Sequence, residues 1–313
     1  MAISDVLTQQ AFAPAPQRSA ATRLLEDERW LAAALLLPTV ILLGLFIAYP
    51  FVEGVWLAVT DSKVGVPGTF VGLANFEQLW NDSIFRTAVY NTFVYTAVAT
   101  VFKLGLGLWL ALLLNRHFKG KAFTRAFILL PFIIPTVLST FAWKWMFDPT
   151  FSVINWTLYQ LGVIHGRINW LGDPDLALIS VIIVNVWRGV PFYAISLLAG
   201  LQTINPELQE AAAIDGARPR QRFCHVTWPL LLPVTMVVVL FSVIQTFADF
   251  QLVYVLTGGG PANATQLFAT YAYQIGVGTG LLSQGAAVSL AMFPVVVVVV
   301  VVQLLYIRRV ETV

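Results

Sequence analysis

Long apolar runs alternate with short polar segments along the chain after its first 29 residues. Each run is long enough for a helix that crosses the roughly 30 Å hydrocarbon core of a bilayer. Because closed membrane barrels use much shorter alternating strands, the pattern predicts an all-α membrane protein. The six predicted transmembrane helices cover roughly 30–52, 88–114, 124–147, 176–201, 229–256 and 284–307.

The segment before the first run is polar, with Pro14 and Pro16 in a stretch rich in Ala, Pro and Gln. The run that follows has the length of a membrane span rather than that of a signal peptide's apolar core. The sequence therefore predicts a flexible tail over 1–29, without a cleaved signal, and a transmembrane domain over 30–313.

Composition supports a lipid environment. Hydrophobic residues make up 58% of the chain and charged residues 11%, against about 25% charged residues in a typical soluble domain. The net charge of +2 argues against a nucleic-acid partner. A single cysteine, Cys224, excludes an intrachain disulfide framework, and three dispersed histidines form no metal-ligand cluster.

Basic residues predict the orientation, because cytoplasmic loops carry the excess of Lys and Arg. The three loops at 53–87, 148–175 and 257–283 hold only Lys63, Arg86 and Arg167. We therefore expect both termini and the loops at 115–125 and 202–228 to be cytoplasmic. These segments hold Arg18, Arg23, Arg29, Arg116, Lys119, Lys121, Arg125, Arg218, Arg220, Arg222, Arg308 and Arg309.

The stretch "PELQEAAAIDGARP" (206–219) interrupts this pattern with a short polar helix. Asn205 is a good N-cap, Pro206 suits the first helical position and Glu207 favours the positive end of the helix. We expect Gly216 to end the helix after two to three turns. The spacing fits either a helix that docks on another protein or a plain connector between two spans.

A family resemblance favours docking. "EAAAIDGARPRQRFCHVTWPLLLP" resembles the EAA loop of permease subunits of ATP-binding-cassette (ABC) importers, with Trp228 as a minor departure. "FVGLANFEQL" (70–79) and "YVLTGGGPANATQLFATYAY" (254–273) resemble the carbohydrate-importing permeases that include the larger membrane subunit of the maltose transporter. The first outward loop, at about 35 residues, lacks that subunit's large inserted domain. The matched EAA positions are Glu210, Ala211, Ala212, Asp215, Gly216, Ala217, Phe223, Pro229 and Pro233.

The resemblance implies a type I importer fold with a cytoplasmic coupling helix in an EAA loop at about 203–229. It implies a multi-pass protein of the bacterial inner membrane that is not itself an enzyme. The implied partners are a second related permease, two cytoplasmic ATPase subunits and an external solute-binding protein. ATP and Mg would be bound by the ATPase, and this chain would need no cofactor. The implied coupling residues are Glu210, Ala211, Ala212, Asp215 and Gly216.

Polar residues inside the spans need a reason, because an ionisable group at the bilayer centre costs roughly 2.5–3.5 kcal/mol. We interpret Lys144 as snorkelling at the outer end of its span and Lys103 as packing or pairing between helices. Kinks are expected at Pro131, Pro135 and Pro191. Two helical stripes must face other helices or a wet cavity. They comprise Asn185, Arg188, Gly189 and Phe192, and Ser242, Gln245, Thr246 and Asp249.

Two interpretations of the stripes stay open. They could hold helices together through hydrogen bonds, and Arg188 and Asp249 could pair with each other. Alternatively, amides, hydroxyls and a carboxylate suit a polyhydroxylated ligand, with Trp187, Phe192 and Tyr193 as aromatic faces. The resemblance supports this second interpretation. Counted from the EAA glutamate, the sugar-contacting positions of the maltose system fall on these stripes, so all eight residues are candidate substrate-binding residues. Gln245, Thr246 and Asp249 depart from the maltose pattern and indicate a different sugar or polyol.

Other function classes fit less well. The sequence has no phosphate-cradling P-loop, and no acid–base pair supports a membrane-embedded enzyme. An ion-gradient-driven secondary transporter is the main alternative. It would predict inverted repeats and broken helices near the midplane, and neither is evident in the sequence.

Overall fold

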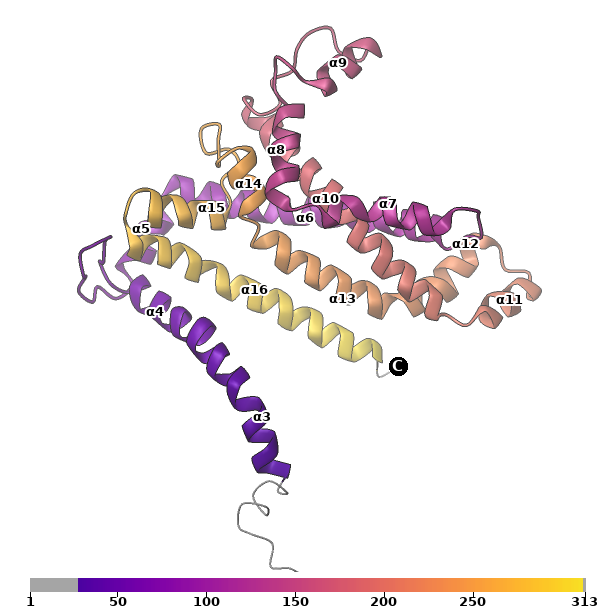
Figure 1. The fold of residues 1–313 in the computed structure, drawn as a ribbon, viewed down its shortest axis with the longest axis horizontal. Coiled ribbons are helices and arrows are strands. Elements are labelled where there is room, and N and C mark those ends of the chain that lie inside the picture. The colour runs from indigo at the N-terminus through magenta and orange to yellow at the C-terminus, as the bar shows by residue number, and fades with distance from the viewer. Residues whose placement is uncertain (1–27, 312–313) are drawn as a thin grey trace, which may run out of the picture. The chain divides into compact units, whose positions relative to one another are not determined.

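The computed structural model describes residues 28–311, with the side chains of 30–306 (Figure 1). The predicted flexible tail lies outside the described residues except for Glu28 and Arg29, which begin the first helix. The chain divides into two compact units, Met1–Gly54 and Val55–Val313, which are described separately.

The described part of unit 1 is helical. It contains α3 (Glu28–Leu43), the π-helical turn η1 (Gly44–Ala48) and the start of α4 (Tyr49–Ala58). These elements form one apolar helix, Trp30–Ala58, long enough to cross a membrane, and none of its most apolar window is buried within the chain. A helix that is apolar on all sides is typical of a hydrocarbon environment, so the first predicted span is confirmed and extended.

Unit 2 holds the remaining helices. Capping side chains begin two of the long ones: Asp82 accepts from the Ile84 N–H before α6, and Asp173 accepts from the Asp175 N–H before α10. The helices are α5 (Ala74–Asn81), α6 (Ser83–Leu114), α7 (Lys121–Ile133), α8 (Thr136–Met146), α9 (Val153–Gln160), α10 (Pro174–Thr203), α11 (Pro206–Ile214), α12 (Pro219–Arg222), η2 (Phe223–Thr227), α13 (Trp228–Phe247), α14 (Gln251–Leu256), α15 (Phe268–Tyr273), η3 (Gln274–Gly278) and α16 (Leu282–Glu311).

Helix α10 is the centre of unit 2. It packs against α6, α7 and α13 (Figure 1), and half of its most apolar window is buried, against 28% for α6. Tyr193 and Leu197 of α10 are fully buried, together with Leu231 of α13. The α6 and α10 backbones approach closely because Gly107 lies against Tyr193, where a Cβ would collide. This contact brings polar residues of α6 next to those of α10.

The third predicted span is wrong as a single continuous helix. The chain breaks between α7 and α8, and the two helices differ in direction by 89°. Ile134 is extended (φ −64°, ψ 130°) and Pro135 caps α8, because a proline disfavours helical geometry in the residue before it. The described chain therefore has five helices able to cross a membrane, or six if the bent pair counts as one span.

The fifth predicted span is wrong at both ends. The apolar helix runs from Pro219 to Phe247, and Ala248, Asp249 and Phe250 separate it from α14. Asp249 therefore does not continue the helical stripe of Ser242, as the spacing predicted. Its carboxylate accepts from the Leu252 N–H at 3.4 Å, a local bond that competes with helix continuation. Broken helices are thus present, one at Pro135, where only a kink was expected, and one at Asp249, where no break was expected.

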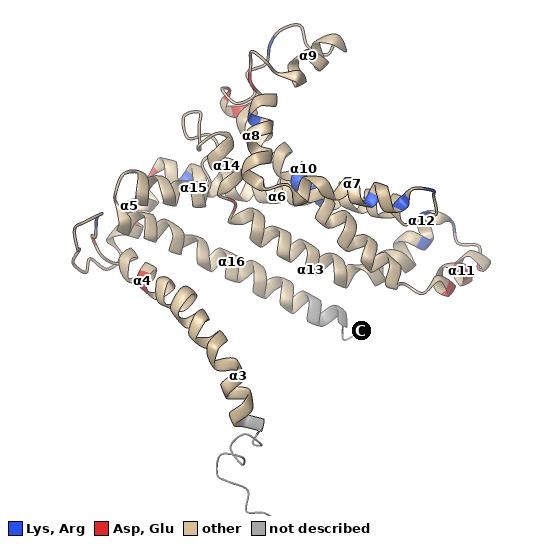
Figure 2. Ribbon diagram, in the orientation of Figure 1, with Lys and Arg blue, Asp and Glu red and all other residues tan. Residues whose placement is uncertain are grey.

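The middle turns of α13 and α16 hold no charged residue, and those of α6 and α10 hold Lys103 and Arg188. Lys and Arg gather around α12 and the start of α7, the end at which α11 also lies (Figure 2). This distribution is typical of helices whose central turns lie in hydrocarbon.

Candidate functional site

A polar cavity of about 270 Å³ lies among α6, α7, α10 and α13. The two predicted stripes meet there, because α10 and α13 pack side by side with these faces toward each other. Seven of the eight predicted substrate-binding residues line the cavity. They are Asn185, Arg188, Gly189, Phe192, Ser242, Gln245 and Thr246, and they are joined by Lys103, Phe132 and Phe241.

Asp249, the eighth predicted residue, lies behind the cavity rather than in its lining. Its side chain is buried, and its Oδ2 accepts hydrogen bonds from Tyr95 Oη at 2.8 Å and Asn185 Nδ2 at 3.1 Å. An Arg188 nitrogen lies 4.0 Å from the same oxygen. The pairing of Arg188 with Asp249 that the sequence left open is therefore present, and Asp249 orients the residues that line the cavity.

Lys103 brings an ammonium group from α6 into the cavity. It is 2% exposed, and its Nζ donates to Asn185 Oδ1 at 3.0 Å and Thr246 Oγ1 at 2.6 Å. The expected role of Lys103 in pairing helices is confirmed, since these bonds join α6 to α10 and α13. Its place in the cavity was missed. A lone lysine within an apolar span was the available signal.

One glycine and one arginine of α10 shape the cavity on that side. Gly189 leaves room for the Lys103 stem, because a Cβ at this position would collide with Lys103 Cδ. Arg188 donates to the hydroxyl of Thr136, the first residue of α8. The break between α7 and α8 thus supplies a polar contact that a straight helix would not place there.

An aromatic cluster forms the apolar wall. The Phe192 ring stacks on Phe132 with centroids 5.8 Å apart, and its centroid lies 5.4 Å from that of Phe241. Phe132 and Phe241 were not predicted as site residues. Of the other aromatic candidates, Tyr193 is buried in the core and Trp187 faces a different cavity. Donors and acceptors opposite flat rings can bind hydroxyl groups and the C–H face of a sugar or polyol.

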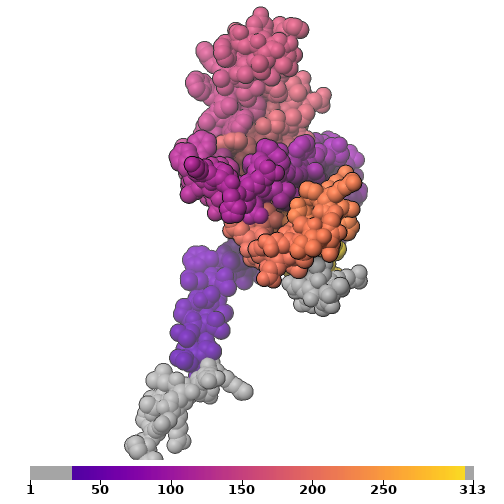
Figure 3. Space-filling view, turned by 90° about the vertical axis from the view of Figure 1, so that its right-hand side faces the viewer, coloured from indigo at the N-terminus to yellow at the C-terminus, as the bar shows by residue number. Residues whose placement is uncertain are grey.

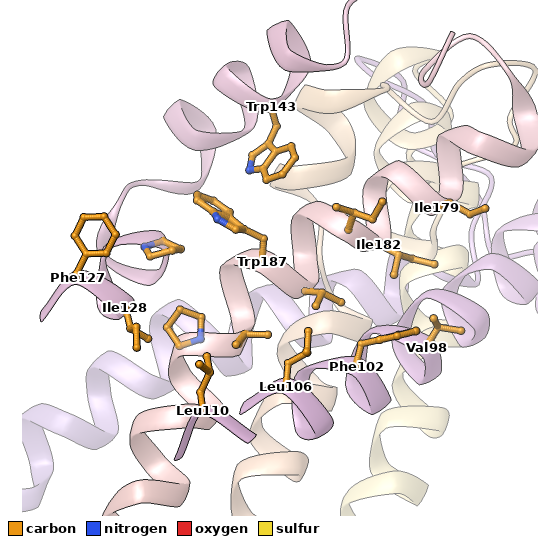
Figure 4. Close-up of a pocket in the computed structure, with 15 residues that line it drawn as sticks. Val98, Phe102, Leu106, Leu110, Phe127, Ile128, Trp143, Ile179, Ile182 and Trp187 are labelled. Carbon is orange, nitrogen blue, oxygen red and sulfur yellow. The ribbon is translucent and has the colours of Figure 1, made fainter. Parts of the chain in front are cut away.

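A second cavity, of about 820 Å³, is larger than the polar one and lies along α6, α7, α8 and α10. Its side chains are aliphatic, aromatic or proline, including Phe102, Leu106, Trp143 and Trp187 (Figure 4). Pro191 lines it without interrupting α10, whereas Pro135 coincides with a complete break. A wall without hydroxyl, amide or charged groups cannot orient a polyhydroxylated ligand, so we do not take this cavity as the substrate site.

Helix α11 has the predicted ends. Asn205 Oδ1 accepts from the Glu207 N–H at 3.1 Å, and Pro206 is the first helical residue. At the other end Gly216 has φ +80°, and the Ala217 N–H donates to the Ala212 carbonyl at 2.9 Å, a typical glycine-ended helix terminus. Figure 3 looks onto this end of unit 2.

The predicted coupling residues lie together on this exposed element. Glu210, Ala211, Asp215 and Gly216 are exposed and Ala212 is half-buried. The helix also exposes Leu208 (47%) and Ile214 (86%) to solvent. Gln209 Nε2 donates to Thr227 Oγ1 at 2.9 Å, which ties α11 to the turn that leads into α13.

Lys144 lies at the end of α8, exposed, with Nζ 3.4 Å from the Val255 carbonyl that accepts its hydrogen bond. It has no part in the polar cavity.

Comparison with known proteins decides the family. The family described as binding-protein-dependent transport system inner membrane component matches residues 103–312. The chain belongs to this family. Its members are transport components of the inner membrane, which favours the importer over the ion-driven carrier and the membrane enzyme.

Relatives of the permease family match nearly the whole chain. The trehalose/maltose transport system permease protein MalF of Thermococcus litoralis is 35% identical over 276 residues, 88% of this chain and 92% of its own length. The sulfoquinovosyl glycerol transport system permease protein SmoG of Agrobacterium fabrum is 35% identical over 290 residues, 92% of this chain and 94% of its own length.

The fold has a solved counterpart. A chain of a bacterial ABC transporter involved in the import of the acidic polysaccharide alginate superposes with a TM-score of 0.80 at 25% identity, covering 92% of this chain and 99% of that chain. The expected all-α importer permease fold is therefore confirmed, as is the resemblance to ABC importer permeases.

Proposed function

We propose that this permease forms half of the translocation path of an ATP-driven importer for a sugar or related polyol, delivered by an external solute-binding protein. One observation carries the proposal. The two long helices that flank α11 contribute eight polar, aromatic or glycine residues to a single cavity. The transport systems named for the two relatives, for trehalose or maltose and for sulfoquinovosyl glycerol, support the same class of substrate.

We further propose that α11 docks on a cytoplasmic ATPase subunit and transmits its closure to α10 and α13. A rigid helix tied to two spans can transmit a rigid-body movement, whereas a flexible loop cannot. The bond between Gln209 and Thr227 and the short connection to α10 support this rigidity. Exposed Leu208 and Ile214 offer apolar contacts, and the small residues Ala211 and Ala212 permit close approach.

The complete importer would contain a second related permease and two ATPase subunits, which bind ATP and Mg. Both termini and α11 would then be cytoplasmic, as the distribution of basic residues in the sequence indicates. The loops that hold α5, α9 and the segment before α15 would face the binding protein.

The test is uptake by proteoliposomes that contain the full importer, loaded with ATP or with a nonhydrolysable analogue. We expect accumulation of a sugar or polyol only with ATP and only with the ATPase present. Uptake by the purified permease alone, driven by an ion gradient, would refute the proposal and favour a secondary transporter.

Gly216→Leu tests the coupling role. It adds an apolar side chain just after the end of α11, at a position with no atom within 4 Å, so its effect on transport must come from strain at φ +80° or from obstructed docking. Gly120→Leu is the matched control, because Gly120 has φ +82°, is equally open and precedes α7. We expect ATP-driven uptake to be lost in the first variant and retained in the second. Equal uptake by both would refute docking through α11.

A further inference from the structure

The side chains that line the polar cavity carry an excess of positive charge. Among the residues whose side chains the structure describes, Lys103 and Arg188 line it and no acidic side chain does. The nearest described carboxylate, that of Asp249, lies behind the lining and accepts from Tyr95 and Asn185. The surface that a ligand would meet is therefore cationic.

The polar network behind this surface does not neutralise it. Lys103, Arg188 and Asp249 contribute two positive charges and one negative charge. Asp249 and Lys103 are 6% and 2% exposed and the Arg188 side chain is 27% exposed, so the network that carries the excess charge is only partly in contact with water. An excess charge at such a depth is costly, and an anion in the cavity would offset it.

The two cationic side chains also have N–H donors that are not used within the described part of the protein. An ammonium group has three N–H donors, and Lys103 uses two of them on Asn185 and Thr246. A guanidinium group has five, and Arg188 directs one to Thr136. Lys103 cannot easily turn away, because its stem is fitted against Gly189 and its Nζ is held on both sides.

We propose that this cavity selects a polyol that carries an oxyanion, namely a carboxylate, sulfonate or phosphate, with Lys103 as a residue that determines this specificity. The inference rests on the proposed function. The hydroxyl of Ser242 and the amide of Gln245 bind hydroxyl groups of the ligand, and the Phe132, Phe192 and Phe241 rings cover its C–H face. A volume of about 270 Å³ is just below the usual range of roughly 300–1,000 Å³ for small-molecule pockets, so this half of the path holds one sugar unit.

The experiment measures ligand binding to the solubilised complete importer without its binding protein, by saturation-transfer NMR. The probes are two matched pairs, D-glucuronate with D-glucose and sn-glycerol 3-phosphate with glycerol. We expect wild type to bind the anionic member about tenfold more tightly. This ratio of affinities corresponds to the free energy of about one hydrogen bond to a charged group. Lys103→Met should remove most of this preference and Lys103→Arg should keep it. Lys144→Met is the matched control and should leave it unchanged, because Lys144 does not line the cavity and donates to the Val255 carbonyl.

The outcomes separate this inference from the proposed function. Equal affinity for both members of each pair in wild type, or an undiminished preference in Lys103→Met, would overturn the anionic specificity. If Lys103→Met does not assemble, the wild-type comparison alone decides. ATP-driven uptake of a neutral sugar in preference to its anionic partner would leave the importer intact and refute only this inference. Absence of ATP-driven uptake of any polyol would overturn both.

Discussion

The polar cavity and helix α11 satisfy their polar groups in opposite ways. In α11 no residue is buried, and its ends are capped by residues within three positions of the helix, such as Asn205 and Ala217. In and behind the cavity, buried groups from α6, α10, α13 and the segment after α13 satisfy one another across distances of 64 to 154 residues in sequence. Local capping leaves α11 free to meet a partner, whereas the cavity depends on the assembled bundle. Mutations should therefore act locally in α11 and cooperatively in the cavity.

Among the proposed substitutions, Asp249→Ala should cause the largest loss in the free energy of unfolding. It removes the acceptor of Tyr95 and Asn185 and the counter-charge of Arg188. Removal of one partner from a buried charged network costs about 3–5 kcal/mol, so we expect this loss in the free energy of unfolding in mixed micelles.

The double variant Lys103→Met/Asp249→Ala tests whether charge balance is the cause. It returns the network to one net positive charge, so it should recover part of the loss seen in Asp249→Ala. Strict additivity of the two single changes would show that the residues do not act as one network.

A smaller effect is expected for Gly189→Ala. The added Cβ would collide with the Lys103 stem, and overpacking typically costs about 1–3 kcal/mol. Gly105→Ala is the matched control in α6, because no atom lies within 4 Å of its Cβ position; alanine there should be neutral or stabilising. The free energies of unfolding of the two variants give the comparison. Equal values would contradict the tight contact between Gly189 and Lys103.

The two regions also differ in what the sequence could predict. The ends of α11 follow from neighbouring residues alone, so Asn205, Pro206 and Gly216 predict them correctly. The cavity residues of α10 and α13 could be predicted because helical spacing defines a face, and a polar face within a span must meet another helix.

The errors lie where tertiary contacts decide. The residue before Pro135 leaves the helical region and ends α7, a change that the apolar pattern conceals. After Phe247 no Gly or Pro marks the end of α13, and Asp249 instead turns toward Tyr95, 154 residues earlier in the chain. Lys103 was recognised as unusual, but only the packing of α6 on α10 identifies its neighbours. Periodicity along one helix carries no information about which distant helix faces it.

The smallest effect should come from Asn205→Ala in α11. Loss of an N-cap typically costs about 1 kcal/mol, and here it leaves the Glu207 N–H without the Asn205 side-chain acceptor. Because the ends of α11 are capped locally, the cost should appear as faster hydrogen exchange of the α11 amides, with unchanged exchange in α10 and α13. Asn205→Ser restores a capping oxygen and should restore slow exchange. Faster exchange around Asn185 and Thr246 as well would mean that α11 and the cavity are coupled even without an ATPase, and the contrast between a local and a cooperative region would fail.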